Sequence, residues 1–175
     1  GYFDVKYMTK DYIRDAAEKG SEPTRNSFIG SHVLFSADEE VTELVRRIPV
    51  FQKQEFEEKM LSFFSNLQLN YNYFWKACRP EGYMKLKVAS EIVYSLYRMV
   101  LQENEILFPC NRRLEQFVKL APDQPEHLVE YCEEFCRTLE DDPLDKALEA
   151  WKAWTHYQYP TDSAVCQSRY CDDFE

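Results

Sequence analysis

The stretch MKLKVASEIVYSLYRMVLQENEILFPCNRRLEQFVK, residues 84–119, decides the fold. Its apolar residues recur at steps of three and four, which is the period of one face of an α-helix. They are Val88, Ile92, Leu96, Met99, Val100, Ile106 and Leu107. Pro109 is expected to end this helix, because the residue before a proline is disfavoured in the helical conformation. A long helix with one apolar face predicts a helical bundle.

A second stripe of the same predicted helix carries charge. Glu91, Arg98 and Glu105 follow one another at seven-residue steps, which places them on one side of a helix, close to Tyr94. A basic element with Arg112, Arg113 and Lys119 comes next along the chain. These residues either line a cleft or form ion pairs on a solvated helix face.

Composition limits the class of protein. The chain has 175 residues, 21 Lys and Arg against 31 Asp and Glu, and a net charge of −10, so it offers no general attraction for DNA. Four glycines argue against an all-β protein. No apolar run is long enough to span a membrane and no secretory signal is visible, which predicts a cytoplasmic protein without a membrane partner.

The cysteines predict free thiols. None of the six has the C-x-x-C spacing of a structural zinc site. A disulfide between Cys166 and Cys171 remains an alternative for the tail.

Three parts are expected along the chain. Residues 1–50 read as β-α-β-α, with strands over 2–8 and 27–35 and helices over 9–19 and 39–48. Residues 54–159 read as a bundle of five helices, and 160–175 as a polar tail. The fold class is therefore mainly α, with a small β-α-β-α remnant before the bundle. Because the chain begins GYFDVKYM without an initiator methionine, we interpret it as a piece of a longer or processed protein.

The order of these motifs resembles a known family. A strand GYFDVKY, a helix ending EKG, a strand HVLFSAD, a helix ending RRIPVF and a long bundle look like the C-terminal part of a polymerase-β-like nucleotidyltransferase. The type is the small bacterial one that includes the aminoglycoside nucleotidyltransferases. In that family Gly-Ser and Asp-x-Asp motifs precede a third carboxylate, which Asp4 matches. The segment ENEILFPCNRRLEQFVK resembles the family's cleft-lining helix and the basic turn after it.

The resemblance implies transfer of a nucleoside monophosphate from an NTP to an acceptor hydroxyl, with Mg²⁺ as cofactor. Asp4 would be a catalytic residue and metal ligand, and Glu91 or Glu105 would be the base. The nucleotide-binding residues would be Lys6, Arg98, Arg112, Arg113 and Lys119.

The chain departs from the family in one respect. It has no Gly-Ser followed by Asp-x-Asp: Gly30-Ser31 precedes His-Val-Leu-Phe, and Asp141-Asp142 lies between helices. Two-metal chemistry needs several converging carboxylates, so the chain is expected to be inactive without a missing N-terminal catalytic segment. The acceptor and the NTP are not specified by this sequence.

Two other classes fit parts of the pattern. A HEPN-like toxin–antitoxin component needs Arg-x(4–6)-His on a helix, and the match, Arg25 to His32, crosses a predicted strand. A non-catalytic interaction module would use the aromatic-rich bundle as a partner or homodimer surface. In that case Asp4 is a strand-edge acid paired with Lys6, and the tryptophans belong to the core.

Overall fold

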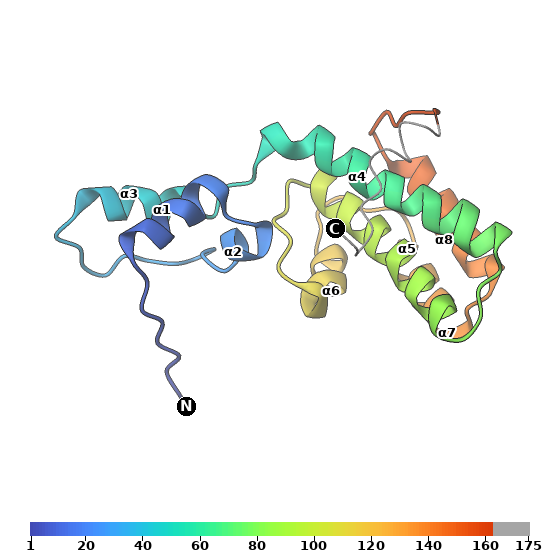
Figure 1. Cartoon of the computed structure of the whole chain (residues 1–175), viewed down its shortest axis with the longest axis horizontal. Helices are drawn as coiled ribbons and strands as arrows, with labels where there is room; N and C mark the ends of the chain where they lie inside the picture. The colour runs from blue at the N-terminus through green and yellow to red at the C-terminus, as the bar shows by residue number, and fades with distance from the viewer. Residues whose placement is uncertain (163–175) are drawn as a thin grey trace. The chain divides into compact units, whose positions relative to one another are not determined.

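The computed structural model describes residues 1–162, which form helices joined by irregular segments. The chain divides into two compact units (Figure 1). The first contains residues 1–51 together with 107–110, and the second contains 52–106 and the described residues from 111 onward.

The first unit contains three helices, α1 (Lys10–Lys19), α2 (Glu22–Asn26) and α3 (Glu39–Arg47). Thr9 caps α1, because its hydroxyl accepts the Tyr12 N–H, and the Asp38 carboxylate caps α3 in the same way. The two helices predicted in this region are confirmed. The buried apolar core of the unit is small and consists of Ala16, Ala17, Leu44 and Ile48.

A buried arginine links the helices of the first unit. Arg25 is 1% exposed. Its guanidinium donates to the carbonyl oxygens of Gly20 at 2.8 Å, Ile48 at 3.0 Å and Ala17 at 3.0 Å. Since helices leave carbonyls unpaired at their C-terminal ends, this one side chain satisfies acceptors where α1 and α3 end.

The segment Leu107–Cys110 is held to α2 by two polar side chains. The buried Glu22 carboxylate accepts the Phe108 N–H at 3.0 Å. Asn26 donates to the Leu107 carbonyl at 2.9 Å. The early helix α2 therefore anchors a segment that is far away in sequence.

Neither predicted strand is present in the described part of the chain. Residues 2–8 are extended and solvent-exposed, with Phe3 and Tyr7 each 98% exposed. The second predicted strand, over 27–35, begins in a turn over 27–30. This turn follows α2, a helix that the sequence analysis did not predict. Pro23 stands at the start of α2, a position that proline favours, and only residues 31–36 remain extended. Each segment lacks an adjacent strand whose backbone could pair with its own N–H and C=O groups.

The second unit is a helical bundle, as predicted. The helix α4 (Phe56–Gln68) continues as a π-helix, η2 (Leu69–Ala77), and packs along α5 (Gly82–Glu103). Helix α7 (Leu128–Thr138) packs along α8 (Asp141–Trp154), and α5 also contacts α7 and the short α6 (Leu114–Lys119). The short 3₁₀ turns η1 (Lys53–Glu55) and η3 (Asn111–Arg113) precede α4 and α6.

Helix α5 is the central helix of this bundle. Every residue from Ser95 to Gln102 is buried, so this half of the helix is enclosed on all sides. The helix ends at Glu103, before the proline expected to end it. Asn104 donates to the Val100 carbonyl, and Glu105 adopts a left-handed conformation with φ 53°. Glu105 is therefore not on the face of α5 that carries Glu91, which corrects the predicted stripe.

The tryptophans and cysteines serve mainly as packing residues. Trp75 and Trp151 are buried, as the core interpretation predicted, whereas Trp154 is partly exposed and donates to Asp123. The described cysteines are free thiols, and Cys132 is the buried one among them. The Cys166–Cys171 pair lies outside the described residues. No helix among the described residues is long and apolar enough to cross a membrane.

We predict that Arg25→Met destabilises the first unit by about 2–4 kcal/mol, because it leaves buried carbonyl groups without a donor. Amide hydrogen exchange in α1 and α3 measures this loss. The matched control is Arg46→Met, since Arg46 lies on the surface and pairs with Glu43 at 3.6 Å. Equal protection in the two variants would contradict the importance of the Arg25 contacts.

Candidate functional site

The predicted site residues belong to both units. Asp4 and Lys6 lie in the exposed extended segment of the first unit. The other predicted residues are in the second unit, where Glu91 lines a hollow. This hollow, here called the α5–α6 cavity, has a volume of about 400 Å³. Its lining residues are Ser90, Glu91, Val93, Tyr94, Tyr97, Asn111, Leu114, Glu115 and Cys136.

Glu91 is oriented by amides of helix α4. Asn66 donates to the Glu91 carboxylate at 3.1 Å and to the Ser95 hydroxyl at 2.9 Å. Asn70 donates in turn to the Asn66 side-chain oxygen at 2.9 Å. These contacts hold the half-buried carboxylate at the cavity wall, and it forms no ion pair with a residue in the described part of the chain.

Arg98 lies behind this wall. Its guanidinium donates to the Tyr94 hydroxyl at 2.6 Å and stacks over the Phe63 ring, 4.4 Å from the ring centroid. Glu105 instead pairs with Lys53 at 2.5 Å. The predicted stripe of Glu91, Arg98 and Glu105 is therefore not one cluster. Arg98 contacts Tyr94, which lines the cavity.

The basic element after α5 borders the cavity. Lys119 contacts the carboxylates of Glu115 at 2.9 Å and Glu133 at 2.6 Å, and both raise its pKa. Arg112 and Arg113 are exposed, and Arg113 lies over the Phe117 ring, 5.0 Å from its centroid. Lys119 is thus held by carboxylates, whereas the two arginines face solvent.

Tyr97 is the residue of this site that the sequence reasoning missed. The side chain is 3% exposed and lines the cavity, and its hydroxyl is buried and interacts with the Cys132 thiol. Burial raises the pKa of Tyr97 and of the Cys132 thiol. Glu91, Tyr94 and Tyr97 follow one another at three-residue steps, a signal present in the sequence.

The chemistry of the lining favours a ligand that donates hydrogen bonds. Two lining residues, Glu91 and Glu115, are acids, and no described lining residue is Lys or Arg. A phosphate group would meet like charge at this surface. The lining of the α5–α6 cavity therefore suits a hydrogen-bond donor better than an anion.

A magnesium site cannot be built from the described residues alone. They contain no group of three or more His, Cys, Asp or Glu side chains arranged to hold a metal ion. Asp4 supplies one carboxylate, and Mg²⁺ in phosphoryl-transfer sites takes several oxygen ligands from protein and substrate. The other protein ligands would have to come from outside this part of the chain.

A second polar cluster ties η2 to α8. The Asp141 carboxylate accepts from Trp75 at 2.7 Å and from Arg79 at 2.9 Å. Lys76 bridges Asp141 and Asp145, at 3.3 Å and 3.0 Å. The acceptors of this cluster are occupied by the bundle's own donors, so we assign it a structural role.

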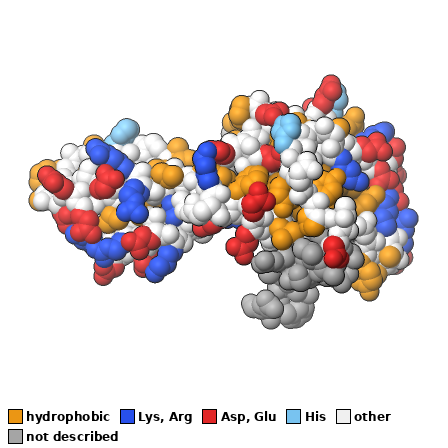
Figure 2. Space-filling model, turned by 90° about the horizontal axis from the view of Figure 1, so that it is seen from above, with side chains coloured by type: hydrophobic (Ala, Val, Ile, Leu, Met, Phe, Trp, Pro, Cys, Tyr) orange, Lys and Arg blue, Asp and Glu red, His pale blue; other side chains and the backbone are white. Residues whose placement is uncertain are grey.

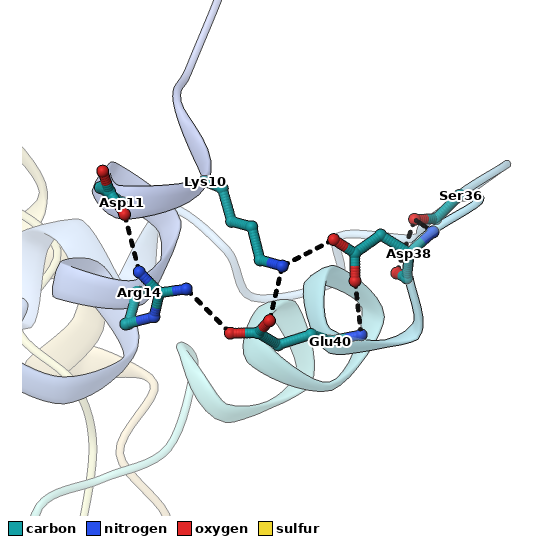
Figure 3. A network of polar contacts seen from close by, with 6 residues as sticks. All are labelled: Lys10, Asp11, Arg14, Ser36, Asp38 and Glu40. Atoms are coloured by element: carbon teal, nitrogen blue, oxygen red, sulfur yellow. Dashed lines mark hydrogen bonds and ion pairs between the residues drawn. The ribbon is translucent and has the colours of Figure 1, made fainter.

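A third cluster joins α1 to α3 in the first unit (Figure 3). Lys10 pairs with Asp38 at 2.7 Å and with Glu40 at 2.5 Å, and Arg14 pairs with Glu40 at 2.9 Å. The Lys10 ammonium lowers the pKa of Asp38. Ser36 accepts the Asp38 N–H at 3.1 Å. The cluster therefore lies where residues 2–8 end and where residues 31–36 end.

The alternative Arg–His motif is not arranged for catalysis. Arg25 is buried and donates to three carbonyls, while His32 is exposed in the extended segment after α2. The two residues do not share a helix, as that motif requires.

Charge is mixed on the surface. On the face drawn in Figure 2, basic and acidic side chains alternate over the first unit, and both kinds are also interspersed on the second. This distribution agrees with the acidic balance of the sequence and offers no extended basic surface on that face.

Comparisons with known proteins add no relative to these observations. No protein-family model, curated protein or solved structure matches the chain.

We predict that the Asp141 carboxyl titrates with a pKa of about 2, because Arg79, Trp75 and Lys76 stabilise its ionised form. Because its pKa is lowered in the folded state, the carboxyl stabilises the fold at every pH above its ordinary pKa. This contribution is lost as the pH falls toward 2. The ¹³C shift of the carboxyl carbon measures the titration. Arg79→Gln should move the midpoint up, and Arg137→Gln, which removes a pair with Glu134 elsewhere, should not.

Proposed function

We propose that this chain is the C-terminal, helical part of a nucleotidyltransferase of the polymerase-β-like type. The whole enzyme transfers a nucleoside monophosphate from an NTP to an acceptor hydroxyl, and another segment supplies the Gly-Ser and Asp-x-Asp half of the site. The observation that carries the proposal is the geometry of the first unit in Figure 3.

The ends of the two extended segments are held next to each other. Lys10 follows residues 2–8 after one residue, Thr9, and Asp38 follows residues 31–36 after one residue, Ala37. The ion pair between them, at 2.7 Å, joins the points where each segment turns into a helix. Parallel strands of an α/β sheet end at one edge in this way, each before its helix.

The apolar side chains of both segments are exposed. Phe3 and Tyr7 lie on one side of the first segment, and Leu34 and Phe35, 96% and 88% exposed, lie in the second. A sheet formed by two such segments needs further strands and a covering layer to bury these side chains. The catalytic segment of a nucleotidyltransferase would provide both, with the segments forming the β-α-β-α remnant.

In this proposal each residue has a defined task. Asp4 would hold Mg²⁺ together with carboxylates of the missing segment, and Lys6 would contact the nucleotide. In the second unit, the acceptor would occupy the α5–α6 cavity, where Glu91 would accept the proton of its hydroxyl. Arg112 and Arg113 would meet the phosphates. Arg98, Glu105 and Lys119, which have partners in the bundle, would support the site.

We predict that Asp4→Asn in the complete protein abolishes transfer, because an amide is a poor substitute for a charged metal ligand. The fold should be intact, since Asp4 is exposed. The measurement is release of pyrophosphate together with circular dichroism. Asp11→Asn is the control, because it removes an exposed acid paired with Arg14 on α1. Near-normal turnover of Asp4→Asn would remove Asp4 from the mechanism.

The chain alone gives a second test of the same proposal. Calorimetry with ATP and Mg²⁺ should show millimolar or no binding to the 175-residue chain, because half of the site is missing. Micromolar, metal-dependent binding would mean that the nucleotide site is complete without another segment.

A further inference from the structure

We infer that residues 2–8 pair with the same residues of a second copy of this chain. The two segments form antiparallel strands related by a two-fold axis at Val5, an interface in which each copy uses the same surface. In the structure this segment is extended and exposed (Figure 1). Its open backbone, its alternating side chains and the order of its charges carry the inference.

The backbone of residues 2–8 is available for pairing. Its N–H and C=O groups form no hydrogen bond within the described part of the chain. The segment contains neither proline nor glycine, so every residue in it can donate to a neighbouring strand. An extended segment with a free row of donors and acceptors is a template to which a strand of another molecule can add.

The apolar side chains complement themselves in the antiparallel register. Phe3, Val5 and Tyr7 lie on one side of the extended segment and are 98%, 68% and 98% exposed. When Val5 is opposite Val5 of the second copy, Phe3 of each copy is opposite Tyr7 of the other. Aromatic and β-branched pairs directly opposite each other stabilise strand pairing. The pairing therefore removes apolar surface from water on this side.

The charges select this register among the possible ones. Asp4 and Lys6 lie on the other side of the segment, and both are exposed. With Val5 on the two-fold axis, Asp4 of each copy is opposite Lys6 of the other, which gives two pairs of opposite charge. Parallel pairing in register would instead place like charges opposite each other, and such pairs are destabilising.

The other extended segment of the first unit matches these charges less well. Residues 31–36 have the sequence SHVLFS, which contains no Asp, Glu, Lys or Arg. This segment has no charged side chain of fixed sign to set opposite Asp4 or Lys6. A second copy of residues 2–8 is therefore the partner whose charges fit.

The size of the segment limits the strength of the dimer. A two-stranded ribbon is at most marginally stable in water, and a pair of seven-residue strands is smaller than the interfaces of stable complexes. We expect a weak dimer with a dissociation constant on the order of 100 µM.

The inference does not rest on the proposed function. A strand has two edges, and its N–H and C=O groups point to them alternately along the chain. When the odd-numbered residues exchange hydrogen bonds with the second copy, the even-numbered residues face the other edge, where a strand of the catalytic segment would pair. Dimerisation is measured without NTP, so its failure is distinguishable from failure of the transfer assay.

The first test is the oligomeric state of the 175-residue chain. Sedimentation equilibrium between about 10 µM and about 1 mM should show monomer and dimer in exchange. In a mixture of labelled and unlabelled chains, NMR should find contacts between Phe3 of one molecule and Tyr7 of another. A monomer at every concentration would overturn the inference. So would a dimer that joins Phe3 to Phe3 or leaves the shifts of residues 2–8 unchanged.

Charge reversal tests the register. Asp4→Lys and Lys6→Asp each replace attractive pairs by repulsive ones, so each should raise the dissociation constant at least about tenfold. The variant with both changes has opposite charges facing each other again, and its dissociation constant should return to within about threefold of the original. The controls Glu18→Lys and Lys152→Asp make the same changes of net charge at exposed positions elsewhere.

The controls should leave the dissociation constant unchanged. A double variant as weak as the single ones would overturn the register, because restored charge pairs should restore the dimer. Controls that weaken the dimer as much as Asp4→Lys and Lys6→Asp would show that net charge, and not this pairing, governs association.

Discussion

The burial on all sides of the second half of helix α5 is the constraint on which the second unit depends. From Ser95 to Gln102 each side chain is inside the bundle, whether it is apolar or not. Polar groups in such a place need partners. Ser95 finds one in Asn66, and the Arg98 guanidinium finds the Tyr94 hydroxyl and the Phe63 ring. The buried Tyr97 hydroxyl interacts with the Cys132 thiol. A helix enclosed to this extent has polar side chains in the interior that an ordinary amphipathic helix would keep at the surface.

The first unit is stabilised differently. Its apolar core is too small to hold three helices by hydrophobic burial alone, since few side chains are removed from water. Polar contacts add to it: Arg25 satisfies carbonyls where helices end, and Glu22 fixes the backbone of the distant Phe108. Buried charges are costly unless they are paired and hydrogen-bonded, so these two positions tolerate little change. A partner segment would add apolar burial that the unit does not have by itself.

The helices of the bundle could be predicted from the sequence because their apolar periodicity is local and strong. The end of α5 could not be predicted from the sequence. Pro109 is a clear stop signal, but the helix ends earlier, at Glu103, where Asn104 contacts the Val100 and Asp123 carbonyls and Glu105 is left-handed. Alternation over residues 2–8 indicated a strand, but strand formation requires a second segment, and periodicity does not report whether one is present. The spacing placed Glu91 close to Tyr94, and both residues line the cavity. Tyr97 was not predicted to lie there, because its burial depends on the packing of α5 against other helices.

The exposed segment Tyr2–Met8 has a consequence for the solution behaviour of the chain. An extended, alternating segment with bare backbone groups is a template on which an identical segment of another molecule can pair. Phe3, Val5 and Tyr7 favour such pairing, whereas Asp4 and Lys6 oppose it when many segments stack in parallel and in register, because like charges then meet. Charged residues placed among apolar ones in this way act as gatekeepers against fibrous aggregation. Asp4, which we propose as a metal ligand, would therefore also oppose the in-register stacking of identical segments.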